Sequence, residues 1–260
     1  MNNKGTNEGT EQEIKFVQRL NKNKDLSCWN DMGIIAKNHY AIRVIYKKYG
    51  ELNGLKILPK ADAFIAKGSI DNNYLKLKKY YLDEDDIERF DLKPVALSGI
   101  SIKRPDSKKY QIMKMSPSTF YKVFKSNILA SGSSIYCNKE NEFNKNMDVI
   151  KAWGISLNEF LSYFNSKLNI NLHSIVDPIN KGNLKKIKLY SNDRIAKKIN
   201  NNQKISNFIF FGIGNFEEPF TASWIYVHGK FQKNYTMPFS ITTGSGRSKG
   251  VYTIVLKPKL

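Results

Sequence analysis

Two charged residues, Asp62 and Lys103, each lie in a short apolar run in the first half of the chain. A carboxylate is a hard oxygen ligand of the kind that Mg²⁺ prefers, and a nearby lysine can stabilise charge that develops on a phosphate or an attacking water. Metal-assisted hydrolysis of a phosphodiester bond uses these groups. The pair therefore predicts metal-assisted phosphodiester chemistry, provided that the fold brings the two side chains together.

The two apolar runs have the pattern of β-strands. Residues 57–66 alternate in polarity and are bounded by proline and glycine, which predicts a strand with Asp62 near its start. Residues 95–103 lie between two prolines and predict a second strand. Because alternate residues share a face, Ser101 and Lys103 should point the same way while the residue between them points into the core. Paired strands would let Asp62 and Lys103 converge.

A helix over about 11–21 is predicted upstream of these strands. Thr10 and Glu13 have the spacing of a capping box at a helix start. Glu13 would share a helix face with the apolar residues that follow, while Glu11 turns away. These apolar residues recur at helical spacing and are Ile14, Phe16, Val17 and Leu20.

In this order the residues resemble the PD-(D/E)XK nuclease superfamily, to which many type II restriction endonucleases belong. Gly9 and Glu13 are similar to its Gly-x-x-x-Glu helix start. Asp62 resembles its metal-binding Asp, Lys103 its catalytic Lys, and Gln111 the Gln that often follows.

The resemblance covers about residues 9–130 and departs from the pattern at two places. Ser101 stands where the superfamily has an acid before x-Lys, and no acid occurs in residues 107–139. Glu13 is therefore the leading substitute ligand. In addition, two residues separate Pro59 from Asp62, whereas the strict family pattern has proline directly before the aspartate.

The resemblance implies a type II restriction enzyme that cuts double-stranded DNA with Mg²⁺. Asp62 and Glu13 would bind the metal, Lys103 would act at the nucleophile, and Ser101 and Gln111 would assist. It also implies a homodimer on palindromic sites, with a cognate DNA methyltransferase as a functional rather than a physical partner.

Each residue also has an ordinary structural interpretation. Glu13 could be only the capping acid, Asp62 a turn residue, and Lys103 with Arg104 a solvated or phosphate-contacting pair. Two other functions therefore stay open: a non-enzymatic basic DNA- or RNA-binding protein, and a repair or resolvase nuclease that recognises DNA structure.

Composition independently favours a nucleic-acid partner. Lys and Arg outnumber Asp and Glu by 42 to 23, for a net charge of +19 and a pI near 9.7, which attracts polyanions. Alternatively, the Lys- and Asn-rich composition partly reflects an AT-rich genome, so that some of this charge serves only solubility. Two cysteines without a CxxC pattern fit a reducing compartment. The polar start and the lack of a long apolar run predict a cytoplasmic protein with no membrane partner.

Several basic residues are candidate DNA contacts. They are Arg104 beside Lys103, Arg247 and Lys249 in a Gly/Ser-rich turn, and Lys185 and Lys186 in a basic segment. An ordinary hairpin loop and a solvated surface are the alternatives.

The expected fold is α/β (α+β), a mixed β-sheet nuclease core flanked by helices, with a β-rich C-terminal portion. Expected regions are a flexible N-terminus over 1–10, the nuclease core over 11–150, and a recognition and core-completing region over 151–260. Further elements expected along the chain are a helical or mixed region at 31–49, an inserted helix or loop at 71–93, a helix opened by Ser116-Pro117 that ends near 132, a loop at 138–148, a helix at 157–168, and β-rich runs from 184 onward at 208–211, 224–227, 239–241 and 251–256.

Overall fold

A computed structural model describes residues 4–44, 59–104, 110–213, 218–233, 238–244 and 251–259. The mixed α/β class expected from the sequence is confirmed. The chain divides into two compact units, Met1–Lys108 with Asn207–Thr236 and Lys109–Ser206 with Met237–Leu260. The first unit therefore combines segments that lie before and after most of the second in sequence.

The first unit is built on a mixed sheet with the strand order β1-β2-β4-β6-β7, and β3 also pairs with β2. Its pairs are antiparallel except β4 with β6, which run parallel. A tight turn at His228 and Gly229, both with positive φ, joins β6 to β7. The strands are β1 (His39–Arg43), β2 (Ala63–Lys67), β3 (Lys93–Pro94), β4 (Ile100–Ile102), β6 (Trp224–Val227) and β7 (Lys230–Lys233).

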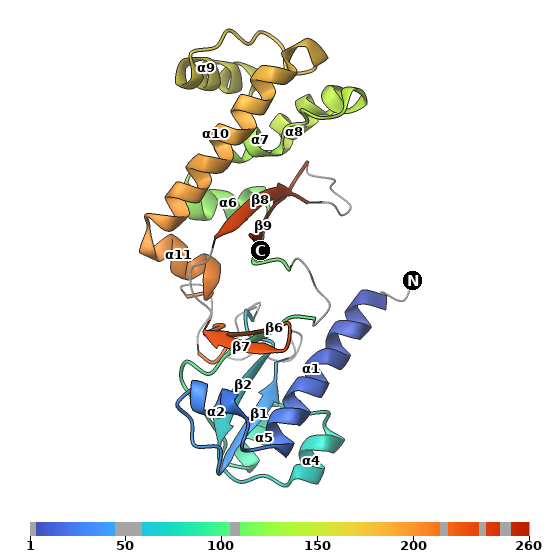
Figure 1. The fold of residues 1–260 in the computed structure, drawn as a ribbon, viewed down its shortest axis with the longest axis vertical. Coiled ribbons are helices and arrows are strands. Elements are labelled where there is room, and N and C mark those ends of the chain that lie inside the picture. Colours follow the sequence, from blue (N-terminus) through green and yellow to red (C-terminus); the bar gives the residue numbers. More distant parts are fainter. Residues whose placement is uncertain are drawn as a thin grey trace. The chain divides into compact units, whose positions relative to one another are not determined.

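Helix α1 (Lys4–Lys22) packs against β4 and against β1, beside which it is seen in Figure 1. Its apolar stripe of Phe16, Val17 and Leu20 is buried in a core that also contains Trp29 and Phe64. Burial of such a stripe, rather than helix propensity, stabilises a helix of this kind. The smaller helices of the unit are α2 (Ser27–Asp31), α4 (Asn72–Leu77) and α5 (Glu84–Arg89).

The structure corrects several expectations for this unit. Helix α1 begins at Lys4, so Gly9 and Thr10 lie inside the helix and the predicted capping box is wrong. In the described part of 31–49, which was predicted to be helical or mixed, a turn is followed by strand β1. The second predicted strand is shorter and spans Ile100–Ile102. Residues 45–58 lie outside the described part of the chain.

The second unit is mostly helical. Helices α7 and α10 pack against each other (Figure 1), and both contact β8 of a small antiparallel sheet with the order β5-β9-β8. The elements are β5 (Met113–Met115), α6 (Pro117–Phe124), α7 (Ile128–Ser134), η2 (Glu140–Lys145), α8 (Asn146–Ala152), α9 (Leu157–Leu168), η3 (Pro178–Asn180), α10 (Lys181–Asn200), β8 (Phe239–Thr243) and β9 (Ile254–Pro258), and α11 (Gln203–Phe210) spans the boundary between the units.

Helix starts in this unit were predicted well. Ser116 caps α6 by accepting a hydrogen bond from the Thr119 amide, and α9 has the predicted bounds. The helix from Ser116 ends earlier than expected, because Lys125 adopts a left-handed conformation, and α7 follows as a separate helix. The predicted loop at 138–148 contains η2 and the start of α8.

The β-rich pattern was placed too early. Residues 184–200 belong to α10, and the strand predicted at 208–211 is wrong because α11 occupies it. The buried positions of α10, from Leu184 to Ile199, recur at helical spacing, which was the overlooked signal. Strands β6, β8 and β9 confirm the later runs. No helix in the described ranges is long and apolar enough to cross a membrane.

Candidate active site

Asp62 lies directly before β2 and is fixed by its backbone between two strands. Its amide donates to the Ile100 carbonyl at 2.8 Å, and its carbonyl accepts from the Val44 amide at 2.9 Å. The side chain points to β4, where Oδ2 accepts hydrogen bonds from the Ile102 amide at 2.6 Å and from Ser101 Oγ at 3.3 Å. The carboxylate is therefore oriented by the strand that leads to Lys103.

Glu13 reaches the same region from α1. Its Oε2 lies 3.0 Å from Nη2 of Arg43, a buried residue at the end of β1. The Arg43 amide donates to the Tyr80 carbonyl at 2.7 Å. The pair connects α1 to the sheet and limits the positions that the Glu13 side chain can adopt.

The electrostatics of Glu13 link it to both predicted partners. Burial raises the pKa of the Glu13 carboxyl, and the negative charge of Asp62 raises it further. The hydrogen bond and charge of Arg43 and the charge of Lys103 oppose this rise in pKa. Glu13, Asp62 and Lys103, which lie on or beside α1, β2 and β4, thus share one electrostatic environment.

Lys103 directly follows β4 and is positioned by the parallel partner strand. Its amide donates to the Tyr226 carbonyl at 2.8 Å, which continues the β4–β6 pairing by one residue. Ser101 is buried and faces Asp62, and Lys103 is half-buried. Two strands that are far apart in sequence, β4 and β6, therefore fix the backbone at Lys103.

Lys60 joins the site although no role was predicted for it. Its Nζ donates to the Ile209 carbonyl at 2.9 Å, and its amide donates to the Phe220 carbonyl, also at 2.9 Å. Burial lowers the pKa of Lys60 to about 7; the charge of Lys103 acts in the same direction and that of Asp62 opposes both. In the sequence, the feature that could have indicated a role for Lys60 was its position two residues before Asp62.

Arg43 was also missed. The signal was an arginine between Ile42 and Val44, inside a run that is otherwise apolar. A buried arginine in such a run requires an anionic partner, and Glu13 supplies it.

The remaining predicted residues lie elsewhere. Arg104 is exposed and pairs with Glu8 at 2.8 Å. Gln111 is exposed in the second unit, so it is not positioned relative to Asp62. Lys185 and Lys186 are exposed on α10 of that unit. Arg247 and Lys249 lie outside the described residues.

Asp62 and Glu13 are the two residues that could hold a Mg²⁺ ion. Within the described ranges no three His, Cys, Asp or Glu side chains form a metal-binding cluster. In the same part of the chain, Asp62 Oδ1 and Glu13 Oε1 have no hydrogen-bond partner, while the other oxygen of each carboxylate is engaged. Mg²⁺ typically binds one or two protein carboxylates and completes its shell with water and phosphate oxygens. The two open oxygens suit that mode of binding.

Comparison with known proteins does not assign the chain to a family. No family model matches the chain, and no curated protein matches its sequence.

Proposed function

We propose that the protein is a Mg²⁺-dependent endonuclease that hydrolyses phosphodiester bonds of double-stranded DNA, in the manner of a type II restriction enzyme. One arrangement carries the proposal: within the described residues, Ser101 and the Ile102 amide hold the Asp62 carboxylate beside the strand that leads to Lys103, and Arg43 holds the Glu13 carboxylate, whose pKa is affected by the charges of Asp62 and Lys103. The net charge of +19 supports DNA as the substrate.

In this mechanism Asp62 and Glu13 would hold the metal, which would supply positive charge to neutralise the scissile phosphate. Ser101 and the Ile102 amide orient Asp62 by occupying its Oδ2, which leaves Oδ1 for the metal. Arg43 orients Glu13 in the same way. Lys103 would supply positive charge beside the attacking water and the pentacoordinate transition state at phosphorus.

The wider assignment follows the same proposal. A cytoplasmic homodimer would match a palindromic site, and a cognate methyltransferase would protect the host DNA. The rivals are a non-enzymatic basic nucleic-acid-binding protein and a nuclease that recognises DNA structure. Buried polar contacts around Asp62 favour a nuclease over the first rival, because mere phosphate binding does not require an oriented carboxylate.

Cleavage of plasmid DNA tests the proposal. With Mg²⁺ the wild-type protein should produce discrete fragments, and with EDTA it should produce none. Asp62→Asn and Lys103→Met should each lower the cleavage rate by ~10²–10³, because each removes one preorganised charge. The affinity of each variant for DNA, measured in EDTA, should stay within about threefold of wild type, because the many remaining cations supply most of the affinity.

Asp91→Asn is the matched control, since Asp91 is an exposed acid of the same unit. It should cut at the wild-type rate. A smear instead of bands would favour the structure-recognising nuclease. Binding without any Mg²⁺-dependent cleavage would leave the non-enzymatic protein, and variants that cut like wild type would place catalysis elsewhere.

A further inference from the structure

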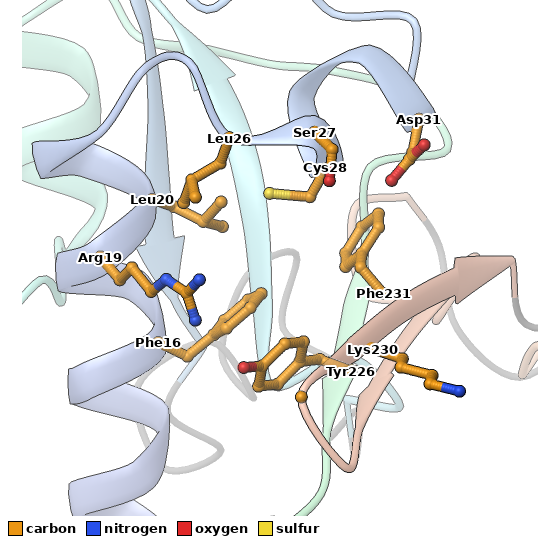
Figure 2. Close-up of a pocket in the computed structure, with 11 residues that line it drawn as sticks. Phe16, Arg19, Leu20, Leu26, Ser27, Cys28, Asp31, Tyr226, Lys230 and Phe231 are labelled. Atoms are coloured by element: carbon orange, nitrogen blue, oxygen red, sulfur yellow. The ribbon is translucent and has the colours of Figure 1, made fainter.

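A pocket separate from the Asp62 centre opens between α1, α2 and the β6–β7 hairpin of the first unit (Figure 2). Its cavity volume is about 330 Å³, at the small end of the range of about 300–1,000 Å³ for ligand sites. The side chains that matter are Phe16 and Arg19 from α1, Cys28 and Asp31 from α2, and Tyr226 and Phe231 from the hairpin.

The aromatic walls are held in place before any ligand binds. Phe16 packs on Tyr226 with ring centroids 4.2 Å apart. Phe231 is the cross-strand partner of Tyr226 and stacks on Trp224 at 4.9 Å with an interplanar angle of 13°. Phe231 lines the pocket and Trp224 does not, so Trp224 supports the Phe231 ring from outside the pocket lining. Rigid aromatic walls of this kind suit a flat aromatic ligand.

The rim of the pocket carries charges of both signs. Arg19 and Asp31 are exposed, and neither forms an ion pair with any other described residue. Figure 2 shows Arg19 on the helix side and Asp31 on the far side, with the Cys28 thiol between them. Burial raises the pKa of Cys28, so this part of the wall is a neutral thiol. A guanidinium suits a phosphate, and a carboxylate accepts hydrogen bonds from an exocyclic amino group.

The pocket shares two elements with the candidate active site. Phe16 follows Glu13 by one turn on the same face of α1. Tyr226 accepts the hydrogen bond from the Lys103 amide through its carbonyl and lines the pocket with its side chain. Helix α1 and strand β6 thus contribute both to the pocket and to the candidate active site.

We propose that the pocket binds one unpaired nucleobase of the nucleic-acid substrate, stacked against Phe231 and Tyr226, with an adjoining phosphate on Arg19. The inference rests on the proposed function, which supplies the nucleic acid. Enzymes that bind an extruded base use aromatic stacking and edge hydrogen bonds in a pocket of this type. A free mononucleotide has the same chemistry and is the alternative source of the ligand.

The test measures binding in EDTA, so that no cleavage is required. Two duplexes are compared, one with a single unpaired 2-aminopurine and one fully paired. Wild type should bind the bulged duplex more tightly by roughly fivefold to a hundredfold, the range expected for stacking one base on protein aromatics, and should quench the 2-aminopurine fluorescence. Phe231→Leu should lose both the preference and the quenching.

Arg19→Ala provides a second variant that leaves the Phe231–Trp224 stack intact, and it should reduce the preference severalfold. Lys15→Ala is its matched control, because Lys15 is an exposed cation of the same helix and does not line the pocket. Circular dichroism and thermal unfolding establish that each variant is folded.

Three results would overturn the inference. The first is that wild type binds the two duplexes equally, and the second is that the preference for the bulged duplex survives in both pocket variants. The third is that deoxynucleoside monophosphates bind saturably while the bulged duplex is not preferred, which would assign the pocket to free nucleotides. Failure of the nuclease proposal is distinct: it would leave the binding preference in place while no DNA is cut with Mg²⁺.

Discussion

Glu13 combines two roles that a single substitution can separate. The negative charge of Asp62 raises the pKa of Glu13, and Glu13 also forms the ion pair with buried Arg43. Glu13→Gln keeps the shape and one acceptor oxygen but removes the negative charge. We expect Mg²⁺-dependent cleavage to fall by ~10²–10³ and the free energy of unfolding to fall by roughly 1–3 kcal/mol, since a hydrogen bond to a charged partner is weakened. Plasmid cleavage and urea unfolding measure the two effects.

Glu11→Gln is the control for this change, because Glu11 is exposed on the opposite side of α1. It should alter neither quantity. If Glu13→Gln lowers stability but cuts at the wild-type rate, Glu13 is a partner of Arg43 and not a metal ligand.

The lowered pKa of Lys60 predicts how stability depends on pH. Between its folded pKa of about 7 and its unfolded value of 10.5, the unfolded chain binds one proton more at Lys60 than the folded protein does. Stability from this residue therefore rises with pH across that window and is lost as pH falls toward 7. The difference in unfolding free energy between wild type and Lys60→Met, measured in urea with EDTA, should shift in favour of wild type from about pH 6 to about pH 9.

Because the unfolding free energy of Lys60→Met is subtracted from that of wild type at each pH, groups that titrate alike in both proteins cancel from the difference. Lys67→Met, which changes an exposed lysine on β2, should show no such pH-dependent difference. A flat difference for Lys60→Met would mean that Lys60 stays protonated in the folded protein and that its ammonium is better solvated than its position implies.

Strand β4 has only three residues, yet it orients Asp62 and leads to Lys103. It is held by β2 on one side and by β6 on the other. Directly before β4, the backbone at Gly99 passes very close to the backbone at Thr221. A Cβ on Gly99 would lie 1.7 Å from the Thr221 carbonyl oxygen. Backbone atoms cannot yield in the way that a flexible side chain can, so this position requires glycine.

Gly99→Ala should therefore displace β4 from β6. We expect a loss of at least about 1–3 kcal/mol in the free energy of unfolding, the usual cost of overpacking, together with loss of cleavage because Ser101 and Lys103 move with the strand. Gly182→Ala in α10 is the matched control, since a Cβ at Gly182 would meet nothing within 4 Å. That change should be neutral or stabilise by about 0.4–1 kcal/mol. Equal stability of the two variants would contradict the close approach at Gly99.

The charge of the whole molecule gives the broadest prediction. With 42 Lys and Arg against 23 Asp and Glu, binding to DNA should be driven largely by release of counterions from phosphates. Affinity measured in EDTA should fall at least about tenfold between about 50 mM and about 200 mM salt. Binding that is absent at low salt, or that does not change with salt, would remove nucleic acid as the partner of this surface.

Local patterns predicted the elements whose signals are complete within a few residues. Ser116 followed by Pro117 identified the start of α6, the spacing of Phe160 and Phe164 identified α9, and the alternation after Asp62 identified β2. Caps, helical spacing and strand alternation act between near neighbours, so they can be recognised without the fold. The order of Glu13, Asp62 and Lys103 likewise named the candidate site.

The same patterns failed where tertiary packing decides between alternatives. Thr10 and Glu13 match a capping box, but α1 continues back to Lys4. The apolar residues at 208–211 suit a strand, yet they end α11, whose residues Ile209 and Phe210 are buried. A short apolar run fits either structure, and its burial partners settle which one forms.

The amino-acid sequence by itself determined the mixed α/β class, the charge and the residue types available for chemistry. Only the tertiary structure decided which of them meet: it paired Glu13 with Arg43, oriented Asp62 through Ser101 and the Ile102 amide, and added Lys60. The parallel pairing of β4 with β6 joins segments separated by most of the second unit. Such long-range pairing depends on the complementarity of surfaces that no local pattern encodes, because side chains distant in sequence become neighbours only once the core has formed.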